Sequence, residues 1–403
     1  MSKVKALHVL HSSLPNQSGY SVRAAHILRY LQEQGISVRA VTSAQQEPIA
    51  AAAVEVIEGV QTWRTPPVRV GQGVPGVRET MLMWALRRQL RRAAADFGPD
   101  LVHAHSPVLC GVPACCLARK LGVPLVYEVR DFWENASVDV GKFGQDSVRY
   151  RLARALDSGV MRRAQAVVVL SQAQRQEVLR RGVAPERLWI AENGVEPPGE
   201  VAPDPGLAAR YGLAGKQVIL YLGAFLPYEG LEVMVAAMAG IAAQAPEARL
   251  LVVGDGELRP ALERQAAALG LDKVVHFAGR VPREQVNAHY LLAQLAVYPR
   301  IRTRTTELTT PLKPLEAMAL GLAVLGSDLP AMREIIREGE TGLLARPGEV
   351  GDLADKCLYA LGHPERMAEL AAAAREMALG ERSWEVTLAA YPRLYRSLLG
   401  REE

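Results

Sequence analysis

Short apolar runs alternate with longer amphipathic segments, and this alternation predicts a repeated strand–helix pattern. Residues 5–12 form the first apolar run, residues 21–34 have helical spacing, and residues 36–42 form the next apolar run. This order is the opening of a doubly wound α/β sheet, which binds ligands at the carboxyl ends of its strands. The first loop carries Gly19 but lacks a Gly-x-Gly-x-x-Gly sequence, which argues against a dinucleotide-binding dehydrogenase.

The same pattern continues and then restarts, which predicts two α/β domains. In the first half we expect an irregular stretch with short strands over 44–77 and a helix over 78–97. Residues 136–163 are polar and basic, and we expect a loop followed by a helix. The Pro/Gly-rich run 197–206 is the best candidate for the boundary. We therefore expect domains over 1–196 and 206–375, with helices in 376–403 packing back on the first domain.

One helix in the last third has the features of a phosphate-binding segment. We expect it to run from Thr310 to Gly321, with Thr310 as its cap and a proline in its first turn. Lys313 lies in that first turn, and Glu316 is on the same face. A cation beside a carboxylate suits a ligand that has a pyrophosphate and a polyhydroxylated ring, such as a nucleotide-sugar. The alternative is a surface helix with one solvated ion pair.

Two strand ends in the first half carry polar side chains. The segment 100–107 is a strand that ends in His103 and His105, which alternation puts on one side. No third metal ligand is signalled nearby, so we expect a place in or behind a site wall on the acceptor side. The strand from residue 124 ends in Arg130 and Asp131, which suit a phosphate and an incoming hydroxyl group. The alternative is an ion pair that only stabilises the loop.

Composition narrows the classes of protein. The chain has 403 residues, 49% of them hydrophobic, and a net charge of +4. It contains no apolar run of transmembrane length and no signal-peptide pattern at its start, so we expect a cytoplasmic protein. The four cysteines show no spacing typical of a metal site. The few aromatic residues are not interleaved with basic ones, which argues against nucleic acid as a partner.

The predicted helix over 78–97 is amphipathic and carries a cluster of arginines next to a tryptophan. The cluster consists of Arg87, Arg88, Arg91 and Arg92. Such a helix can lie on an anionic membrane surface, which would make the protein peripheral on the inner face of the cell membrane. The alternative is a scaffold helix whose arginines face water.

Taken together, these pieces resemble family 4 of the retaining glycosyltransferases, which have two Rossmann-like domains in the GT-B arrangement. The resemblance covers nearly the whole chain. It rests on seven short sequences in the family's order: Gly19 before the first helix, 100–105, 192–195, 253–256, 277–281, 316–321 and 340–344. The sequences 127–131 and 311–313 are similar to the branch that builds bacterial surface polysaccharides, including the enzymes found with exosortase systems.

The resemblance implies roles for individual residues. Glu316 matches the second glutamate of the family's Glu-x7-Glu motif, which binds the donor ribose, whereas Leu308 occupies the first position with Glu307 beside it. The family's Arg and Lys for the pyrophosphate are missing from the loop 223–230, so we expect Lys313, with Arg130 or Arg300, to supply that charge. The residues implied on the donor side are Gly19, Arg130, Gly223, Gly254, Arg280, Val281, Thr309, Thr310, Pro311, Leu312, Lys313 and Glu316.

The resulting prediction is a metal-independent glycosyltransferase without a cofactor. It would move a sugar from a nucleotide-sugar, with UDP preferred over GDP, to a hydroxyl acceptor and retain the anomeric configuration. Lys313 and Glu316 would serve the departing diphosphate and the donor, and Asp131 would orient the acceptor. Two alternatives remain: a nucleotide-sugar 2-epimerase of the same fold, and a non-catalytic scaffold in a polysaccharide assembly complex.

Overall fold

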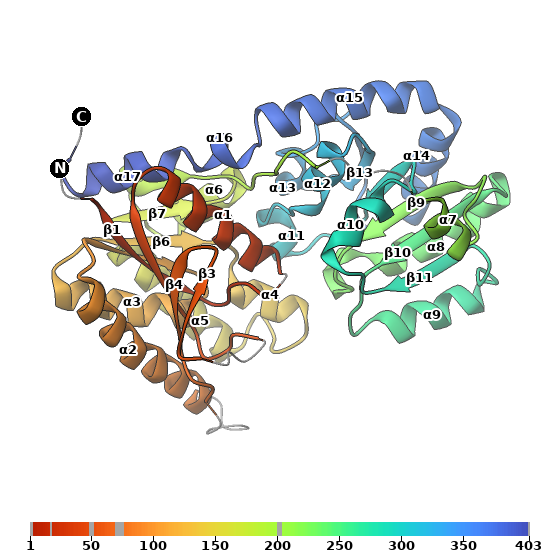
Figure 1. The fold of residues 1–403 in the computed structure, drawn as a ribbon. Helices are drawn as coiled ribbons and strands as arrows, with labels where there is room; N and C mark the ends of the chain where they lie inside the picture. The colour runs from red at the N-terminus through yellow and green to blue at the C-terminus, as the bar shows by residue number, and fades with distance from the viewer. Residues whose placement is uncertain (1–2, 17, 48–51, 69–75, 200–203, 402–403) are drawn as a thin grey trace. The chain divides into compact units, whose positions relative to one another are not determined.

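The computed structural model describes residues 3–16, 18–47, 52–68, 76–199 and 204–401. The chain divides into two compact units (Figure 1). Unit 1 comprises residues 1–192 and 387–403, and unit 2 comprises residues 193–386. The end of the chain thus returns to the first unit, whereas residues 376–386 belong to the second. Part of the Pro/Gly-rich run, residues 200–203, lies outside the described residues.

Unit 1 contains an eight-stranded sheet in the order β3-β4-β2-β1-β5-β6-β7-β8. The neighbouring strands are parallel except for the β3–β4 hairpin, which forms part of the stretch expected to be irregular. The strands are β1 (Lys5–Leu10), β2 (Ser37–Thr42), β3 (Val54–Ile57), β4 (Val60–Arg64), β5 (Leu101–His105), β6 (Leu125–Val129), β7 (Ala166–Val169) and β8 (Leu188–Ile190).

The helices of unit 1 begin and end largely where the sequence indicates. The serine side chains of Ser18 and Ser147 cap α1 and α5, because each accepts a hydrogen bond from a backbone N–H of the first turn. The helices are α1 (Gly19–Glu33), α2 (Val77–Phe97), α3 (Val108–Leu121), α4 (Trp133–Asp139), α5 (Val148–Arg163), α6 (Gln172–Arg180) and, from the chain end, α17 (Ala390–Leu398). Helix α4 corrects the sequence prediction, which had a loop over its second half.

Unit 2 repeats the architecture with a six-stranded parallel sheet in the order β11-β10-β9-β12-β13-β14. Its strands are β9 (Gln217–Leu222), β10 (Ala248–Val253), β11 (Val275–Gly279), β12 (Leu295–Tyr298), β13 (Ala323–Ser327) and β14 (Leu343–Ala345). Its helices are α7 (Pro205–Arg210), α8 (Leu231–Gln244), α9 (Arg259–Ala268), α10 (Arg283–Tyr290), α11 (Arg304–Leu308), α12 (Lys313–Ala319), α13 (Pro330–Arg333), α14 (Val350–Gly362) and α15 (Pro364–Gly380), and α16 (Trp384–Leu388) crosses the unit boundary.

Both faces of the unit 2 sheet are covered, which explains the continuous apolar runs of its strands. Along β9, Ile219 and Tyr221 belong to the core on one face, whereas Val218, Leu220 and Leu222 belong to the core on the other. A sheet buried in this way can bind a ligand only at a strand end or an edge, so the carboxyl ends of the strands are the place to look.

Within the described residues, no helix has the length and hydropathy needed to cross a membrane.

Candidate active site

The strands of unit 2 end beside one another in tightly packed loops. Gly254 follows β10 with a φ of 131°, and a Cβ at this position would collide with the carbonyl oxygen of Gly223 after β9. The two glycines therefore let two loops touch backbone to backbone. Arg280 and Val281 follow β11 at the same edge of the sheet, with Arg280 exposed. The predicted donor residues of unit 2 thus lie along one edge.

Helix α12 is shorter than the sequence predicts. It starts at Lys313, after Leu312, and no side chain caps it. Thr310 does not cap the helix, because its carbonyl and hydroxyl oxygens lie 2.9 and 3.3 Å from the amide nitrogen of Asn193. Thr309 has an extended backbone, and Leu312 has helical angles directly before Lys313, so Thr309 to Pro311 precede the helix instead of forming its first turn. Gly321 ends the segment in the left-handed conformation, as expected.

The start of α12 is tied to strand β12. The Tyr298 hydroxyl donates to the carbonyl oxygen of Lys313 at 2.9 Å, and the Tyr290 hydroxyl reaches the same oxygen at 3.4 Å. The Lys313 ammonium then donates to the carboxylate of Glu316 at 2.8 Å. Both charged side chains are about one-third exposed, at 38% and 31%, so a ligand can reach them.

Arg300 brings a second positive charge to this edge. Its guanidinium donates to the carbonyl oxygen of Thr309 at 2.9 Å and to the carboxylate of Glu229 at 3.2 Å. The side chain is almost fully buried, and its Nε has no hydrogen-bond partner among the described residues. Arg300 follows β12, and its guanidinium reaches the loop after β9, where the resemblance led us to expect basic residues and the sequence has Glu229.

The position of the missing motif glutamate is a core position. Leu308 is 4% exposed and ends helix α11, which the sequence analysis did not predict. Glu307 beside it is partly exposed and forms an ion pair with Arg302 at 2.9 Å. Its carboxylate is therefore already engaged by a neighbouring arginine.

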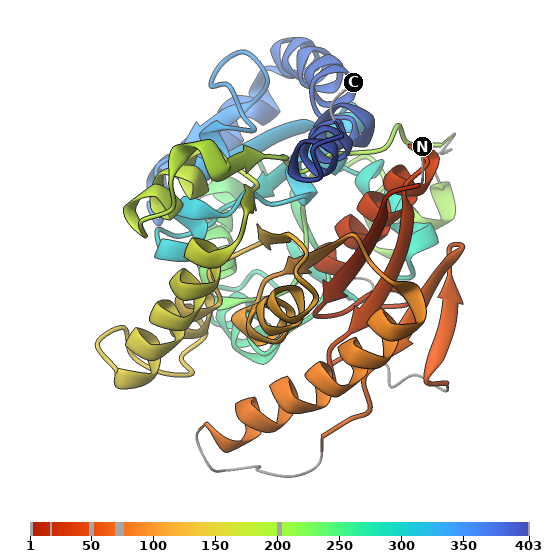
Figure 2. The same cartoon turned by 90° about the vertical axis from the view of Figure 1, so that its left-hand side faces the viewer.

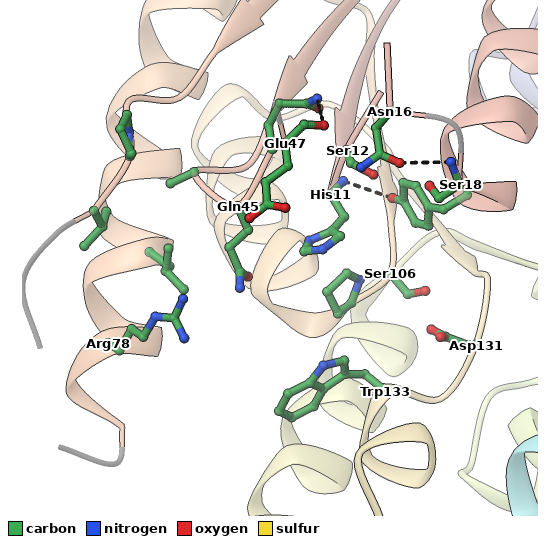
Figure 3. A pocket seen from close by; sticks show the side chains of 17 residues that line it. His11, Ser12, Asn16, Ser18, Gln45, Glu47, Arg78, Ser106, Asp131 and Trp133 are labelled. Atoms are coloured by element: carbon green, nitrogen blue, oxygen red, sulfur yellow. Dashed lines mark hydrogen bonds between the residues drawn. The ribbon is translucent and has the colours of Figure 1, made fainter. Parts of the chain in front are cut away.

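Unit 1 contains a cavity of about 740 Å³ at the carboxyl ends of β1 and β5 (Figure 3). Its polar lining includes His11, Ser12, Asn16, Gln45, Ser106 and Asp131. Hydroxyl, amide and carboxylate groups of this kind can hydrogen-bond a polyhydroxylated molecule. Trp133 and Leu82 add apolar surface to the same cavity.

Asp131 is the acidic group that follows β6 into this cavity. Burial raises its pKa to about 6, although the charge of Arg130 and the Ser106 hydroxyl act in the opposite direction. His11, which the sequence analysis did not single out, lies in the same cavity (Figure 3). Burial, followed by the charge of Lys142, lowers the pKa of His11, so its ring is neutral at pH 7. Its Nδ1 has no hydrogen-bond partner within the described part of the chain.

Arg130 and the two predicted histidines lie behind the cavity wall rather than in it. The Arg130 guanidinium packs 4.6 Å from the Tyr20 ring and donates to the Tyr20 carbonyl oxygen at 3.1 Å. His103 and His105 are stacked, with ring centroids 4.4 Å apart, which agrees with the predicted common side. Both are completely buried, and none of these three residues lines the cavity.

A buried carboxylate, Glu128, organises this inner layer. Arg23 donates to Glu128 at 3.0 Å, and the Tyr391 hydroxyl of α17 donates to its other oxygen at 2.6 Å. Burial alone would raise the pKa of Glu128, but the positive charge of Arg23 and the neighbouring His105 hold that pKa well below its usual value. The carboxylate is therefore ionised beneath the Arg130–Asp131 loop.

Three histidines and a tyrosine complete a ring of contacts with Glu128. The distances are 3.3 Å from Glu128 to His103, 2.6 Å from His103 to Tyr395, 3.3 Å from Tyr395 to His8, 3.1 Å from His8 to His105, and 3.7 Å from His105 back to Glu128. Burial lowers the pKa of all three histidines, so each carries one proton. With the hydroxyl proton of Tyr395, four protons then serve five contacts, so at least one contact has no proton of its own.

The same histidines are close enough for a metal ion, since one nitrogen from each lies within 4.8 Å of the others. The surroundings do not favour a cation, because the Glu128 carboxylate already neutralises the buried guanidinium of Arg23 and lies 3.5 Å from that of Arg130. Both nitrogens of His8 and of His103 also face hydrogen-bonding partners. The donor set fits a proton-sharing network better than a metal site.

Two family models match the chain, one in each compact unit. The model described as "Glycosyl transferase 4-like domain" matches residues 18–194, and the model described as "Glycosyl transferases group 1" matches residues 209–377. Together they account for most of the chain.

Individual relatives and structures agree with these matches. The alpha-D-kanosaminyltransferase of Streptomyces kanamyceticus is 29% identical over 302 residues, which cover 72% of this chain and 76% of the relative. A GDP-mannose-dependent alpha-mannosyltransferase of Mycobacterium tuberculosis is 27% identical over 404 residues, covering 100% and 98%. The structure of Anabaena Alr3699/HepE in complex with UDP and glucose has a TM-score of 0.77 at 18% identity, covering 98% and 100%.

The strand order of both sheets, the two matched domains and the solved structure agree on one fold. The chain is therefore a glycosyltransferase of the GT-B fold with two Rossmann-like domains.

Proposed function

We propose that the protein transfers a sugar from a UDP-sugar to a hydroxyl acceptor, with retained anomeric configuration, in the assembly of a bacterial exopolysaccharide or glycolipid. The observation that carries this proposal is the partly exposed Lys313–Glu316 pair at the carboxyl edge of the unit 2 sheet. A cation for the diphosphate and a carboxylate for the ribose hydroxyls lie one helical turn apart there. The missing motif glutamate and the missing Arg/Lys pair are the best support for the scaffold, whereas the retained Lys313 and Glu316 support an enzyme.

The donor side of the reaction needs positive charge, because the diphosphate leaves with growing negative charge. Lys313 would meet that charge after releasing Glu316, and Arg300 would add to it, since one of its buried N–H groups lacks a partner among the described residues. Fixed cations in a partly buried site stabilise such a leaving group without reorganisation. UDP is proposed over GDP with support from the UDP complex of Alr3699/HepE, whereas the mycobacterial relative is named for GDP-mannose.

The acceptor would bind in the unit 1 cavity. An ionised Asp131 accepts a hydrogen bond from the attacking hydroxyl and orients it, and the leaving phosphate takes the proton in a same-face attack. The neutral His11 offers a further contact to an acceptor hydroxyl. The exposed arginines of α2 support a peripheral place on an anionic membrane, where a lipid-linked acceptor would be found.

Donor binding tests the proposal directly. Glu316→Gln and Lys313→Ala should each weaken UDP binding by about tenfold or more in calorimetric titration, because each loses one charge-assisted contact. The matched control is Lys356→Ala, which removes another partly exposed ion pair of unit 2, that with Glu338. Tighter binding of GDP than of UDP would show that the donor carries guanine and not uracil. Wild-type UDP affinity in both site variants would refute the donor site.

Product analysis separates the reaction classes. Wild-type protein incubated with UDP-glucose and a polyhydroxylated acceptor should form an α-linked product, visible by nuclear magnetic resonance. Formation of an epimerised donor in the absence of acceptor would instead favour the 2-epimerase.

A further inference from the structure

We propose that the outer faces of α2 and α5 form one docking surface for an anionic lipid membrane. We define the α2–α5 face by Trp84, Arg87, Arg88, Arg91, Arg92, Val148, Arg151, Leu152 and Leu156. The inference deepens the proposed function, because it adds a second helix and an apolar anchor to a membrane contact that the sequence placed on α2 alone.

Helix α5 carries an apolar stripe that faces solvent. Val148, Leu152 and Leu156 follow one another at four-residue intervals and are 78%, 58% and 42% exposed. Four-residue spacing places them on one side of the helix. Arg151, also exposed, lies next to the stripe. Large exposed apolar side chains gathered in one row mark a contact surface, whereas isolated ones do not.

Helix α2 presents a matching basic stripe. Trp84 is 57% exposed, and Arg87, Arg88 and Arg91 follow it at helical intervals of three, four and seven residues. Within the described part of the chain, neither these arginines nor Arg92 forms an ion pair. Their charge is therefore not neutralised by the protein itself.

The two helices belong to one side of unit 1. Both pack against α3, and the Arg149 guanidinium at the start of α5 forms an ion pair with Glu79 at the start of α2, at 2.7 Å. Figure 2 shows the orange α2 and the yellow α5 flanking α3. Cys116 on α3 is exposed. The apolar and basic stripes can thus meet one flat partner.

Charge decides which partner fits. Helices α2 and α5 together contain ten arginines but three acidic residues, whereas the whole chain has a net charge of +4. The rest of the chain is therefore net acidic, and the positive charge is concentrated on this side of unit 1. A row of arginines beside tryptophan, valine and leucine complements an anionic lipid surface, where the arginines meet headgroups and the apolar side chains enter the interface.

The unit 1 cavity lies next to the α2–α5 face. Arg78 and Leu82 in the first turns of α2 line the unit 1 cavity, so the cavity opens at the end of the unit where α2 and α5 begin. A protein docked through this face would hold its cavity near the lipid headgroups. An amphiphilic acceptor would then have a short path from the membrane to Asp131, and this last step rests on the proposed function.

Vesicle sedimentation of the full-length protein tests the surface without any enzymatic assay. The wild type should bind vesicles of phosphatidylglycerol and phosphatidylcholine and lose that binding as salt is raised. Leu152→Glu combined with Leu156→Glu, and separately Arg87→Glu combined with Arg91→Glu, should each reduce binding about tenfold or more. The matched control combines Leu269→Glu with Val386→Glu, two side chains of unit 2 with similar exposure, 44% and 53%. The control should bind like the wild type.

Each other outcome has a defined meaning. Equal binding of the wild type to pure phosphatidylcholine vesicles, or no binding to any vesicle, would overturn the membrane proposal. The proposed function would be unaffected by that result, because the UDP titration tests it separately. Full vesicle binding by the α5 variant would overturn the role of α5. If the wild type were a dimer in size-exclusion chromatography and this variant a monomer, the apolar stripe of α5 would be a contact between two copies of the protein instead. Unchanged thermal unfolding of the variants excludes misfolding as the cause.

Discussion

Asp131 is a side chain whose surroundings oppose the charge that its proposed role requires. Its pKa in the folded protein is about 6, above the value of about 3.9 for an unfolded chain. For an acid this sign means that the ionised form destabilises the fold. This loss of stability is absent below the pKa of the unfolded chain, grows as the pH rises from that pKa to the pKa of the folded protein, and is complete above about pH 6.

The first prediction follows from that sign. Asp131→Asn should be more stable than the wild type by about 1–3 kcal/mol at pH 8 and about equally stable at pH 4, as measured by urea unfolding. The same variant should lose transfer activity, because the amide is a poorer acceptor for the incoming hydroxyl. Equal stability of the two proteins at both pH values would show that Asp131 carries no such penalty.

Glu128 shows the opposite case, a buried carboxylate that its neighbours hold in the ionised state. Glu128→Ala leaves the buried guanidinium of Arg23 without its counter-charge, and we expect a loss of about 3–5 kcal/mol in the free energy of unfolding. The control is Glu369→Ala, which removes an exposed partner of Arg366 and should change stability little. A loss in the Glu128 variant no larger than in the control would contradict the assigned role.

At the scale of elements, strand β12 determines where helix α12 starts. The Tyr298 hydroxyl holds the Lys313 carbonyl oxygen, so the first turn and its charged pair keep a fixed position relative to the sheet. No side chain caps the helix at Leu312, and this bond to a carbonyl oxygen does not satisfy the first N–H groups of the helix; it only holds the first turn in place. The position of the donor charges therefore depends on a contact between two separate elements.

Removing that hydroxyl tests the idea. Tyr298→Phe should lower the free energy of unfolding by about 1 kcal/mol, the usual cost of one hydrogen bond, and weaken UDP binding in calorimetric titration. Tyr359→Phe, a change of a partly exposed tyrosine on α14, is the control and should leave both quantities as they are. Undiminished UDP affinity in Tyr298→Phe would show that the contact does not position the site.

At the scale of the whole molecule, the chain end completes the first unit. Tyr391 and Tyr395 on α17 are fully buried and reach Glu128 and His103, which lie about 260 to 290 residues earlier in the chain. The described elements of unit 2, by contrast, all come from one continuous segment, 193–386. The two units therefore depend on the C-terminal residues to different degrees.

Truncation after Val386 should separate the two units in stability. Hydrogen exchange should become faster in β5 and β6 of the truncated protein, whereas β9 and β10 should keep their protection and UDP should still bind. Truncation after Gly400 leaves α17 intact and serves as the control. Equal protection of β5 in the wild type and in the protein ending at Val386 would contradict the role of α17.

The sequence by itself determined most of the elements and their order, because strands and helices reflect local periodicity of apolar side chains; the short helices α4 and α11 are the exceptions. The alternation of β and α segments predicted two parallel doubly wound sheets, and helical spacing placed Lys313 and Glu316 on one face, as observed. The common side of His103 and His105 also followed from strand alternation. Each of these features depends on residues only a few positions apart.

Only the tertiary structure decided which polar groups are accessible and which are buried. Glu128 gathers partners from α1, β5 and α17, and no local pattern relates these segments. Arg300 follows β12 but pairs with Glu229, which lies in the loop after β9. Thr310 accepts a hydrogen bond from the side chain of Asn193 and does not cap helix α12 as predicted. Burial and long-range pairing arise only when distant segments pack together, so the roles of single charged side chains became visible only in the folded chain.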